Sequence, residues 1–217
     1  MSADLPGVAA ELVVFAKAPL LGRVKSRLAT GIGEEAALAF YRRTLETVLA
    51  RLDGGGPWRT RLAVTPDDAA GAKGLWPTAT RRVPQGLGDL GARMGRLLAD
   101  ARRAAPVVIV GSDIPDLTAA HVAHAFDALS RRDLALGPAT DGGYWLIGAS
   151  LPLPGRVFDG VRWSTAHARA DTLRNADALD LATALVDELE DVDDVEGYRR
   201  FLARAGAVSS ARRAEPL

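Results

Sequence analysis

Short apolar runs rich in β-branched residues alternate with segments of helical spacing along almost the whole chain. Two of these runs, Glu11–Ala16 (ELVVFA) and Pro106–Val110 (PVVIV), are typical of strands that are buried on both faces. Between them, Glu34–Leu52 repeats apolar residues at helical spacing, and the glycine-rich stretch Asp53–Pro57 ends that helix. This alternation predicts an α/β fold with a mostly parallel sheet covered by helices on both faces.

The remaining elements continue the alternation. Further strands are expected at Arg61–Thr65, Thr80–Val83, Leu134–Gly137, Trp145–Gly148 and Leu181–Leu189. Further helices are expected at Leu90–Ala104, Ala119–Leu129, Thr165–Ala178 and Val195–Ala205, with Thr118 and Ser164 as caps and residues 17–33 as a loop. Since no repeat or low-complexity linker divides the chain, we expect one domain over 1–217, with its core at 11–205 and a frayed tail at 209–217.

The composition restricts both cofactors and partners. Lys plus Arg equals Asp plus Glu, at 27 each, so no overall charge attracts nucleic acid. The absence of cysteine excludes disulfides and thiolate metal sites, which leaves a hard cation on oxygen ligands as the natural metal. The start of the chain lacks the pattern of a secretory signal, and no run approaches the roughly 18–20 apolar residues of a membrane span. We therefore expect a cytoplasmic protein with no membrane span.

Four cations follow the first strand on a glycine-containing loop: Lys17, Arg23, Lys25 and Arg27. In an open α/β sheet, ligands bind beyond the carboxyl ends of the strands, so this loop can surround a polyphosphate. The alternative is a solvated basic loop. Two of the three lysines of the chain lie here, against 24 arginines overall, which favours a position where a compact ammonium meets a phosphate. The loop matches neither the P-loop nor the GxGxxG fingerprint.

A carboxylate follows the strongest strand, in the turn GSDIPDL. Asp113 lies between that strand and Pro115, where it can hold Mg²⁺ or Mn²⁺, ions that keep several waters and take other ligands from phosphates. Asp116 has a different role available, as a cap of the helix that begins near Thr118. The sequence therefore predicts Asp113 as a metal ligand and Asp116 as a cap.

The segment GPATDGGY follows the next strand, and its two glycines allow an acceptor to approach the backbone closely. Asp141 would bind a hydroxyl group or a metal-bound water there, with a plain hairpin turn as the alternative. Later in the chain, free N–H groups at the predicted helix start could meet an anion, unless they are only capped. The predicted acceptor-binding residues are Gly142, Gly143, Tyr144, Ser164 and Thr165, and the predicted catalytic residues are Lys25, Asp113 and Asp141.

The order FAKAPLLGRVKSRLA, GSDIPDL, GPATDGGYWLIG, FDGVRWST and DVDDVE resembles an uncharacterised bacterial family of the nucleotide-diphospho-sugar transferase superfamily, labelled a GT-A-type glycosyltransferase. The resemblance spans roughly residues 11–203, and the first loop is also similar to that of 2-phospho-lactate guanylyltransferase. It implies a Rossmann-like GT-A fold with one reversed strand and a divalent metal on Asp113. It also implies a second metal contact at Asp191 or Asp193, although DVDDVE departs from the usual DxDTPED pattern; a solvated acidic turn is the alternative.

Three functions remain open after this resemblance. A glycosyltransferase would move a sugar from a nucleotide sugar to a small acceptor, and a guanylyltransferase-like nucleotidyltransferase would release pyrophosphate from a nucleoside triphosphate. A non-catalytic nucleotide-binding module is the third, disfavoured because Asp113, Lys25 and DGGY occur together. The four-cation loop favours nucleotidyl transfer, whereas the family label favours glycosyl transfer, which we expect. Neither the donor's base and sugar, nor the acceptor, nor the oligomeric state follows from these residues.

Overall fold

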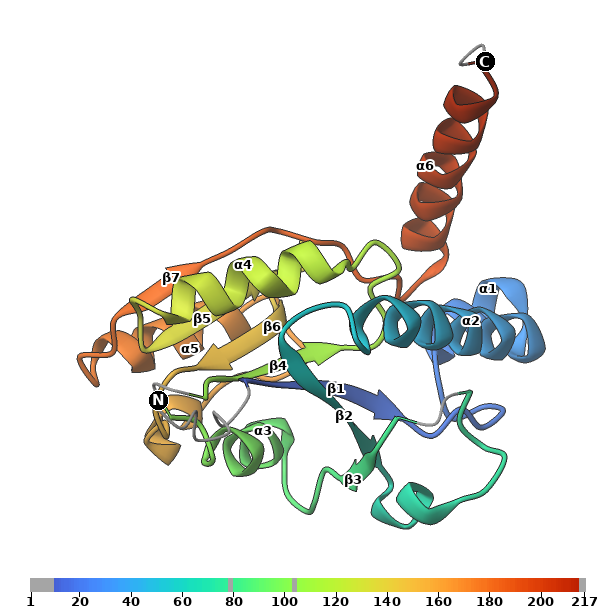
Figure 1. Cartoon of the computed structure of the whole chain (residues 1–217). Helices are drawn as coiled ribbons and strands as arrows, with labels where there is room; N and C mark the ends of the chain where they lie inside the picture. The colour runs from blue at the N-terminus through green and yellow to red at the C-terminus, as the bar shows by residue number, and fades with distance from the viewer. Residues whose placement is uncertain (1–9, 78–79, 103–104, 215–217) are drawn as a thin grey trace, which may run out of the picture.

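The described strands of the computed structural model form one seven-stranded sheet with the order β3-β2-β1-β4-β6-β5-β7 (Figure 1). The structure describes residues 10–77, 80–102 and 105–214. The strands are β1 (Ala10–Lys17), β2 (Trp58–Thr65), β3 (Arg82–Pro84), β4 (Val107–Gly111), β5 (Leu134–Pro138), β6 (Tyr144–Ala149) and β7 (Thr183–Leu185). Among these strands β6 alone is reversed, because it pairs antiparallel with both β4 and β5. The mixed, mostly parallel sheet of the predicted fold is therefore confirmed.

Six α-helices and two short 3-10 helices connect the strands in the described part of the chain. They are α1 (Ser26–Ile32), α2 (Glu34–Leu52), η1 (Asp67–Gly71), α3 (Leu90–Leu98), α4 (Ala119–Leu129), η2 (Gly155–Phe158), α5 (Ala168–Asp177) and α6 (Val195–Ala214). Among the described helices, none is both long and apolar enough to cross a membrane. Helix α6 packs its first half on the ring of Phe40 and then projects from the rest of the molecule (Figure 1).

Helices cover both faces of the sheet, as the sequence predicted. Helices α2 and α4 pack on one face, where they share a buried cluster with Leu12 and Val14 of β1. Helices α3 and α5, with η2, pack on the other face together with Val13 and Ile109. Successive side chains of β1 therefore enter opposite layers, which explains why Glu11–Ala16 is apolar without alternation. Each such buried aliphatic side chain contributes about 1.5–3 kcal/mol.

Several predicted boundaries are corrected by the structure, and the basic loop is the most important. Residues Ser26–Ile32 of that loop form α1, because the fully buried Leu28 gives this short segment a place against α2. Helix α3 is shorter than predicted and ends at Leu98, and β7 covers three residues of a predicted longer strand. Helix α6 is longer, and its backbone runs to Ala214 through most of the predicted tail; residues 215–217 lie outside the described residues.

Two of the three capping predictions are wrong. The side chain of Thr118 caps α4 in a reciprocal arrangement with His121, and α4 has the predicted bounds. Asp116 was predicted as a cap of the same helix, but its carboxylate forms an ion pair with Arg204 of α6 at 3.0 Å. Ser164 does not cap α5, which begins only at Ala168; instead it adopts a left-handed backbone with φ of 59°.

Candidate functional site

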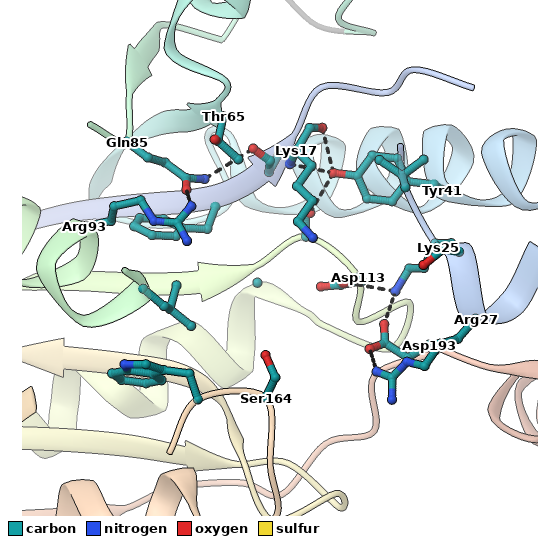
Figure 2. A pocket seen from close by; sticks show the side chains of 18 of the residues that line it. Lys17, Lys25, Arg27, Tyr41, Thr65, Gln85, Arg93, Asp113, Ser164 and Asp193 are labelled. Atoms are coloured by element: carbon teal, nitrogen blue, oxygen red, sulfur yellow. Dashed lines mark hydrogen bonds and ion pairs between the residues drawn. The ribbon is translucent and has the colours of Figure 1, made fainter. Parts of the chain in front are cut away.

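A cavity of about 590 Å³ opens where the carboxyl ends of β1, β2 and β4 meet (Figure 2). Lys17 comes from the end of β1, Thr65 from the end of β2, and Asp113 from just beyond β4. Gln85, which directly follows β3, completes this edge, and Ser164 faces it from a loop after η2. Parallel strands β2, β1 and β4 thus bring segments far apart in sequence to one rim, where α/β folds bind ligands.

A buried lysine links the predicted phosphate loop to the predicted metal ligands. The Lys25 ammonium donates hydrogen bonds to Asp113 Oδ2 at 2.9 Å and to Asp193 Oδ1 at 2.6 Å, and its side chain is 3% exposed. Arg27 Nη2 donates to the other oxygen of Asp193 at 2.5 Å. The pKa of Asp193 is lowered, because attraction to these two cations outweighs the opposing effect of burial. Two of the four loop cations are therefore already paired with carboxylates.

The backbone brings the acidic segment after β7 to the end of β4. Leu189 N donates to Pro138 O at 3.1 Å, so the chain leaving β7 follows the end of β5. Val192 N then donates to the carbonyl of Asp113 at 3.2 Å. Asp193 follows directly and meets Lys25. This non-local crossing, rather than any local motif, places the two predicted metal carboxylates together.

The site concentrates more negative charge than its own lysine balances. The pKa of Asp191 is raised to about 6, first by burial and then by repulsion from three carboxylates, those of Asp193, Asp141 and Asp113. Burial alone would lower the pKa of Lys25, but attraction to Asp113 and Asp193 outweighs it, and the pKa is raised. Within the described residues, no three acidic or histidine side chains form a ready-made metal cage. A divalent ion would therefore need further ligands from a bound molecule.

A smaller cavity of about 240 Å³ adjoins the first and contains most of the predicted acceptor residues. It is lined by Asp141, Gly143, Tyr144, Ser164 and Thr165, together with the acidic residues around Lys25. Asp113 and Ser164 line both cavities, so they stand at the junction where a donor in one cavity would meet an acceptor in the other. Molecules bound in the two cavities would therefore be held next to one another.

Two predicted site residues lie elsewhere. Arg23 is exposed, and it is not among the described residues that line these cavities. Gly142, with φ of 88°, packs against the main chain of Ala166, where an added Cβ would lie 2.4 Å from the carbonyl oxygen. The packing of two loops therefore leaves no room for a side chain at this position, and Gly142 does not line the cavities among the described residues.

Several residues that line the larger cavity were not predicted from the sequence. Gln85, Arg93 and Trp163 all line the larger cavity, as does the buried Tyr41. Tyr41 Oη accepts from Lys17 N and donates to Lys17 O, both at 2.9 Å, and burial raises the pKa of Tyr41 to about 12, so it stays neutral. Gln85 begins the polar, glycine-rich stretch QGLGD directly after a strand, a signal that could have drawn attention to it.

Comparisons with known proteins agree with this architecture. The sequence profile of a family described as "Uncharacterized protein conserved in bacteria (DUF2064)" matches residues 48–165. A solved structure from Desulfovibrio desulfuricans G20, provisionally assigned as a nucleotide-diphospho-sugar transferase, is 31% identical. The alignment covers 86% of this chain and 83% of that one, with a TM-score of 0.77. No curated protein matches the chain in a sequence search.

More distant solved structures share the fold alone. The inositol-1-phosphate CTP transferase from T. maritima is 12% identical, with 88% of this chain and 92% of that chain covered and a TM-score of 0.52. Glucosyl-3-phosphoglycerate synthase from Mycobacterium tuberculosis, solved with Mn²⁺, UDP and glucosyl-3-phosphoglycerate, is 14% identical. Its alignment covers 85% of this chain and 71% of that chain, with a TM-score of 0.50. One fold thus serves different transferases, so the fold alone does not determine the reaction.

Proposed function

This chain belongs to the bacterial family described as DUF2064, and on that premise we propose that it is a metal-dependent transferase using a nucleotide-activated donor. The reaction that the site supports best is glycosyl transfer from a nucleotide sugar to a small acceptor. The observation that carries the proposal is the meeting of Asp113 and Asp193 on one buried lysine at the junction of two cavities. The larger cavity would take the donor, and the smaller one the acceptor.

The carboxylate cluster fits a hard divalent cation. Asp113 and Asp193 already accept hydrogen bonds from the Lys25 ammonium, a cation that stands between them in this structure. Mg²⁺ or Mn²⁺ is commonly held by one or two carboxylates plus phosphates and waters, so a donor diphosphate would complete the shell. Asp113, with Asp193 or Asp191, would hold the ion. When bound, it would neutralise the diphosphate.

The chain's own cations would stabilise the leaving group. Lys17 points its ammonium into the larger cavity in Figure 2. Among the described residues, this ammonium forms no hydrogen bond or ion pair with another side chain. Lys25 and Arg27 line the same cavity beside the carboxylates. As the bond between sugar and diphosphate breaks, negative charge grows on the diphosphate, where preoriented ammonium and guanidinium groups are most effective. Lys25 would then exchange a carboxylate partner for a phosphate oxygen.

The acceptor would approach from the smaller cavity. Asp141 is oriented by its own loop, because its Oδ1 accepts a hydrogen bond from Gly143 N at 2.8 Å. The carboxylate is exposed and lines the cavity, so it suits an acceptor hydroxyl as a hydrogen-bond partner. Ser164, at the junction, can contact either substrate. Holding both substrates against one another supplies much of the rate enhancement in such a reaction.

Nucleotidyl transfer is the second candidate, because Lys17, Lys25 and Arg27 all line the donor cavity. Charge would grow on pyrophosphate in that reaction and would require several cations besides the metal. In the structure, however, Arg23 is exposed and lines neither cavity among the described residues. The loop therefore offers one cation fewer than the sequence predicted, which favours the diphosphate leaving group.

The leaving group distinguishes the two reactions. The purified protein would be incubated with Mn²⁺ and pooled small acceptors, with nucleotide sugars in one arm and the four nucleoside triphosphates in the other. Separate coupled assays would measure nucleoside diphosphate and pyrophosphate, and the Asp113→Asn variant would serve as the blank for contaminating hydrolases. We expect Asp113-dependent release of nucleoside diphosphate. Asp113-dependent pyrophosphate with no diphosphate would replace glycosyl by nucleotidyl transfer.

A further inference from the structure

Arg93, in the middle of α3, presents a preoriented guanidinium to the larger cavity. Its Nη1 donates to Gln85 Oε1 at 2.9 Å, and its Nε donates to the carbonyl of Asp89 at 3.2 Å. Gln85 is itself held, because its buried Nε2 donates to Ala16 O and Ala63 O, at 3.3 and 3.0 Å. An amide locked on two neighbouring strands thus orients the guanidinium plane, and little side-chain freedom remains to be lost on binding.

The other edge of this guanidinium has no protein partner among the described residues. Arginine carries five N–H donors and no acceptor, and the hydrogen bonds of Arg93 to Gln85 and Asp89 use one N–H of Nη1 and that of Nε. No carboxylate in the described part of the chain forms an ion pair with it. Arg93 nevertheless lines the cavity and is only partly exposed. This edge is therefore available to donate hydrogen bonds to acceptor atoms of a molecule bound in the cavity.

Arg93 lies at the end of the cavity opposite the carboxylates. Figure 2 shows the Gln85–Arg93 pair at one end and the Lys25, Asp113 and Asp193 group at the other, with Lys17 between them. A nucleotide whose diphosphate meets the carboxylate group would extend its nucleoside towards Arg93. Phe15 and Leu90 are partly buried apolar residues that line the same cavity, and such side chains suit the faces of a base.

We propose that Arg93 selects donors whose nucleobase has a carbonyl oxygen in place of the exocyclic amino group of adenine, namely guanine or uracil, over donors that carry adenine. This inference rests on the proposed function and specifies its donor. A guanidinium only donates hydrogen bonds, so it matches adjacent acceptors such as O6 and N7 of guanine, or a carbonyl of uracil. Adenine presents an amino group at the equivalent position, which would place one donor against another.

Nucleotide binding tests this selection without any turnover. Calorimetry in the presence of Mn²⁺ would compare GDP, UDP and ADP on the unaltered protein. We expect GDP or UDP to bind about tenfold or more tightly than ADP, the effect of one charge-assisted hydrogen bond. Arg93→Met should remove that preference by weakening GDP or UDP binding, with little change for ADP. Arg93→Lys, which keeps the positive charge but not the planar set of donors, should keep the fold and lose most of the preference.

Arg96→Met is the matched control. Arg96 lies on the same helix and also contacts Gln85, through the carbonyl at 2.6 Å, but it does not line the cavity among the described residues. The control loses the same charge and should keep the base preference. Equal affinities of the three nucleotides for the unaltered protein would overturn the inference. So would an Arg93→Met variant that weakens all three equally, since that result indicates a phosphate contact. Absence of all nucleotide binding would overturn the proposed function itself.

Discussion

Lys25 Nζ lies 2.9 Å from Asp113 Oδ2, although 88 residues separate the two positions in the sequence. The sequence predicted these residues for two different ligands, a phosphate and a metal ion. In the structure the two residues pair with each other, and the Lys25 ammonium, which is buried, would be costly to leave unpaired. On the proposed function, donor and metal would replace this pair together, which leads to the first prediction.

Replacing Lys25 by methionine should change metal and nucleotide binding in opposite directions. The substitution removes the ammonium that competes for Asp113, so Mn²⁺ alone should bind about tenfold more tightly. Nucleotide in the presence of Mn²⁺ should bind about tenfold more weakly, because one charge-assisted contact to phosphate is lost. Calorimetry measures both affinities. Lys73→Met is the control, since Lys73 is exposed and should affect neither. If the affinities for Mn²⁺ and for nucleotide both fell, Lys25 would not exchange a carboxylate for a phosphate as proposed.

The Asp113→Asn variant should lose metal-dependent nucleotide binding and remain folded. Asparagine keeps the shape and one acceptor oxygen for Lys25, but it removes the charge that holds a divalent ion. Titration with UDP or GDP in the presence of Mn²⁺ measures the loss, and circular dichroism checks the fold. Asp116→Asn makes the same charge change three residues later, at a surface pair with Arg204, and should bind normally. Unchanged nucleotide affinity in folded Asp113→Asn would exclude the metal role.

Asp191 should make the protein less stable as the pH rises. Its pKa is raised to about 6 in the folded protein, above the roughly 3.9 of an unfolded chain, so its protonated form is favoured by folding. The stabilisation is complete below pH 4 and is lost as the pH rises through about 6. Asp191→Asn should therefore increase the free energy of unfolding by roughly 1 kcal/mol at pH 8, measured as a higher melting temperature, and should leave it unchanged at pH 4. Equal shifts at both pH values would contradict this origin.

The loop that carries Trp163 and Ser164 should depend on Asp171. This fully buried carboxylate of α5 accepts three hydrogen bonds from Arg162, through its backbone N, Nε and Nη2, and its pKa is well below the usual range for that reason. Asp171→Asn should release the loop and lower turnover by roughly tenfold or more, because the substrates lose alignment. Donor affinity should fall less, since Lys17 and Asp113 are untouched.

Steady-state kinetics on the donor and acceptor that the leaving-group assay identifies would measure this split. Arg174→Ala is the control for Asp171, because Arg174 also pairs with that carboxylate, at 2.9 Å, but belongs to α5 itself. It should leave turnover nearly unchanged. If Asp171→Asn lowers donor affinity and turnover equally, the Asp171–Arg162 pair stabilises the whole fold and does not specifically position the loop.

Local sequence patterns determined most of the architecture. The apolar runs before Lys17 and Gly111 predicted β1 and β4, and the helical spacing of Glu34–Leu52 predicted α2 with the observed ends. The cap at Thr118 follows from side-chain chemistry within one turn. Asp113 could be placed at the carboxyl edge of the sheet, because it directly follows a predicted strand and the ends of parallel strands share one edge. These features depend on neighbours in sequence, which is why they were predictable.

Only the tertiary structure decided which polar groups meet. Lys25 contacts Asp113 and Asp193 because β1 lies beside β4 and the chain after β7 crosses to Asp113, and neither relation is encoded in a local pattern. The same holds for Arg93, whose direction depends on Gln85 and, through it, on two strands. Strand order and chain crossings arise from packing of the whole core, so residues close in space at the site are far apart in sequence.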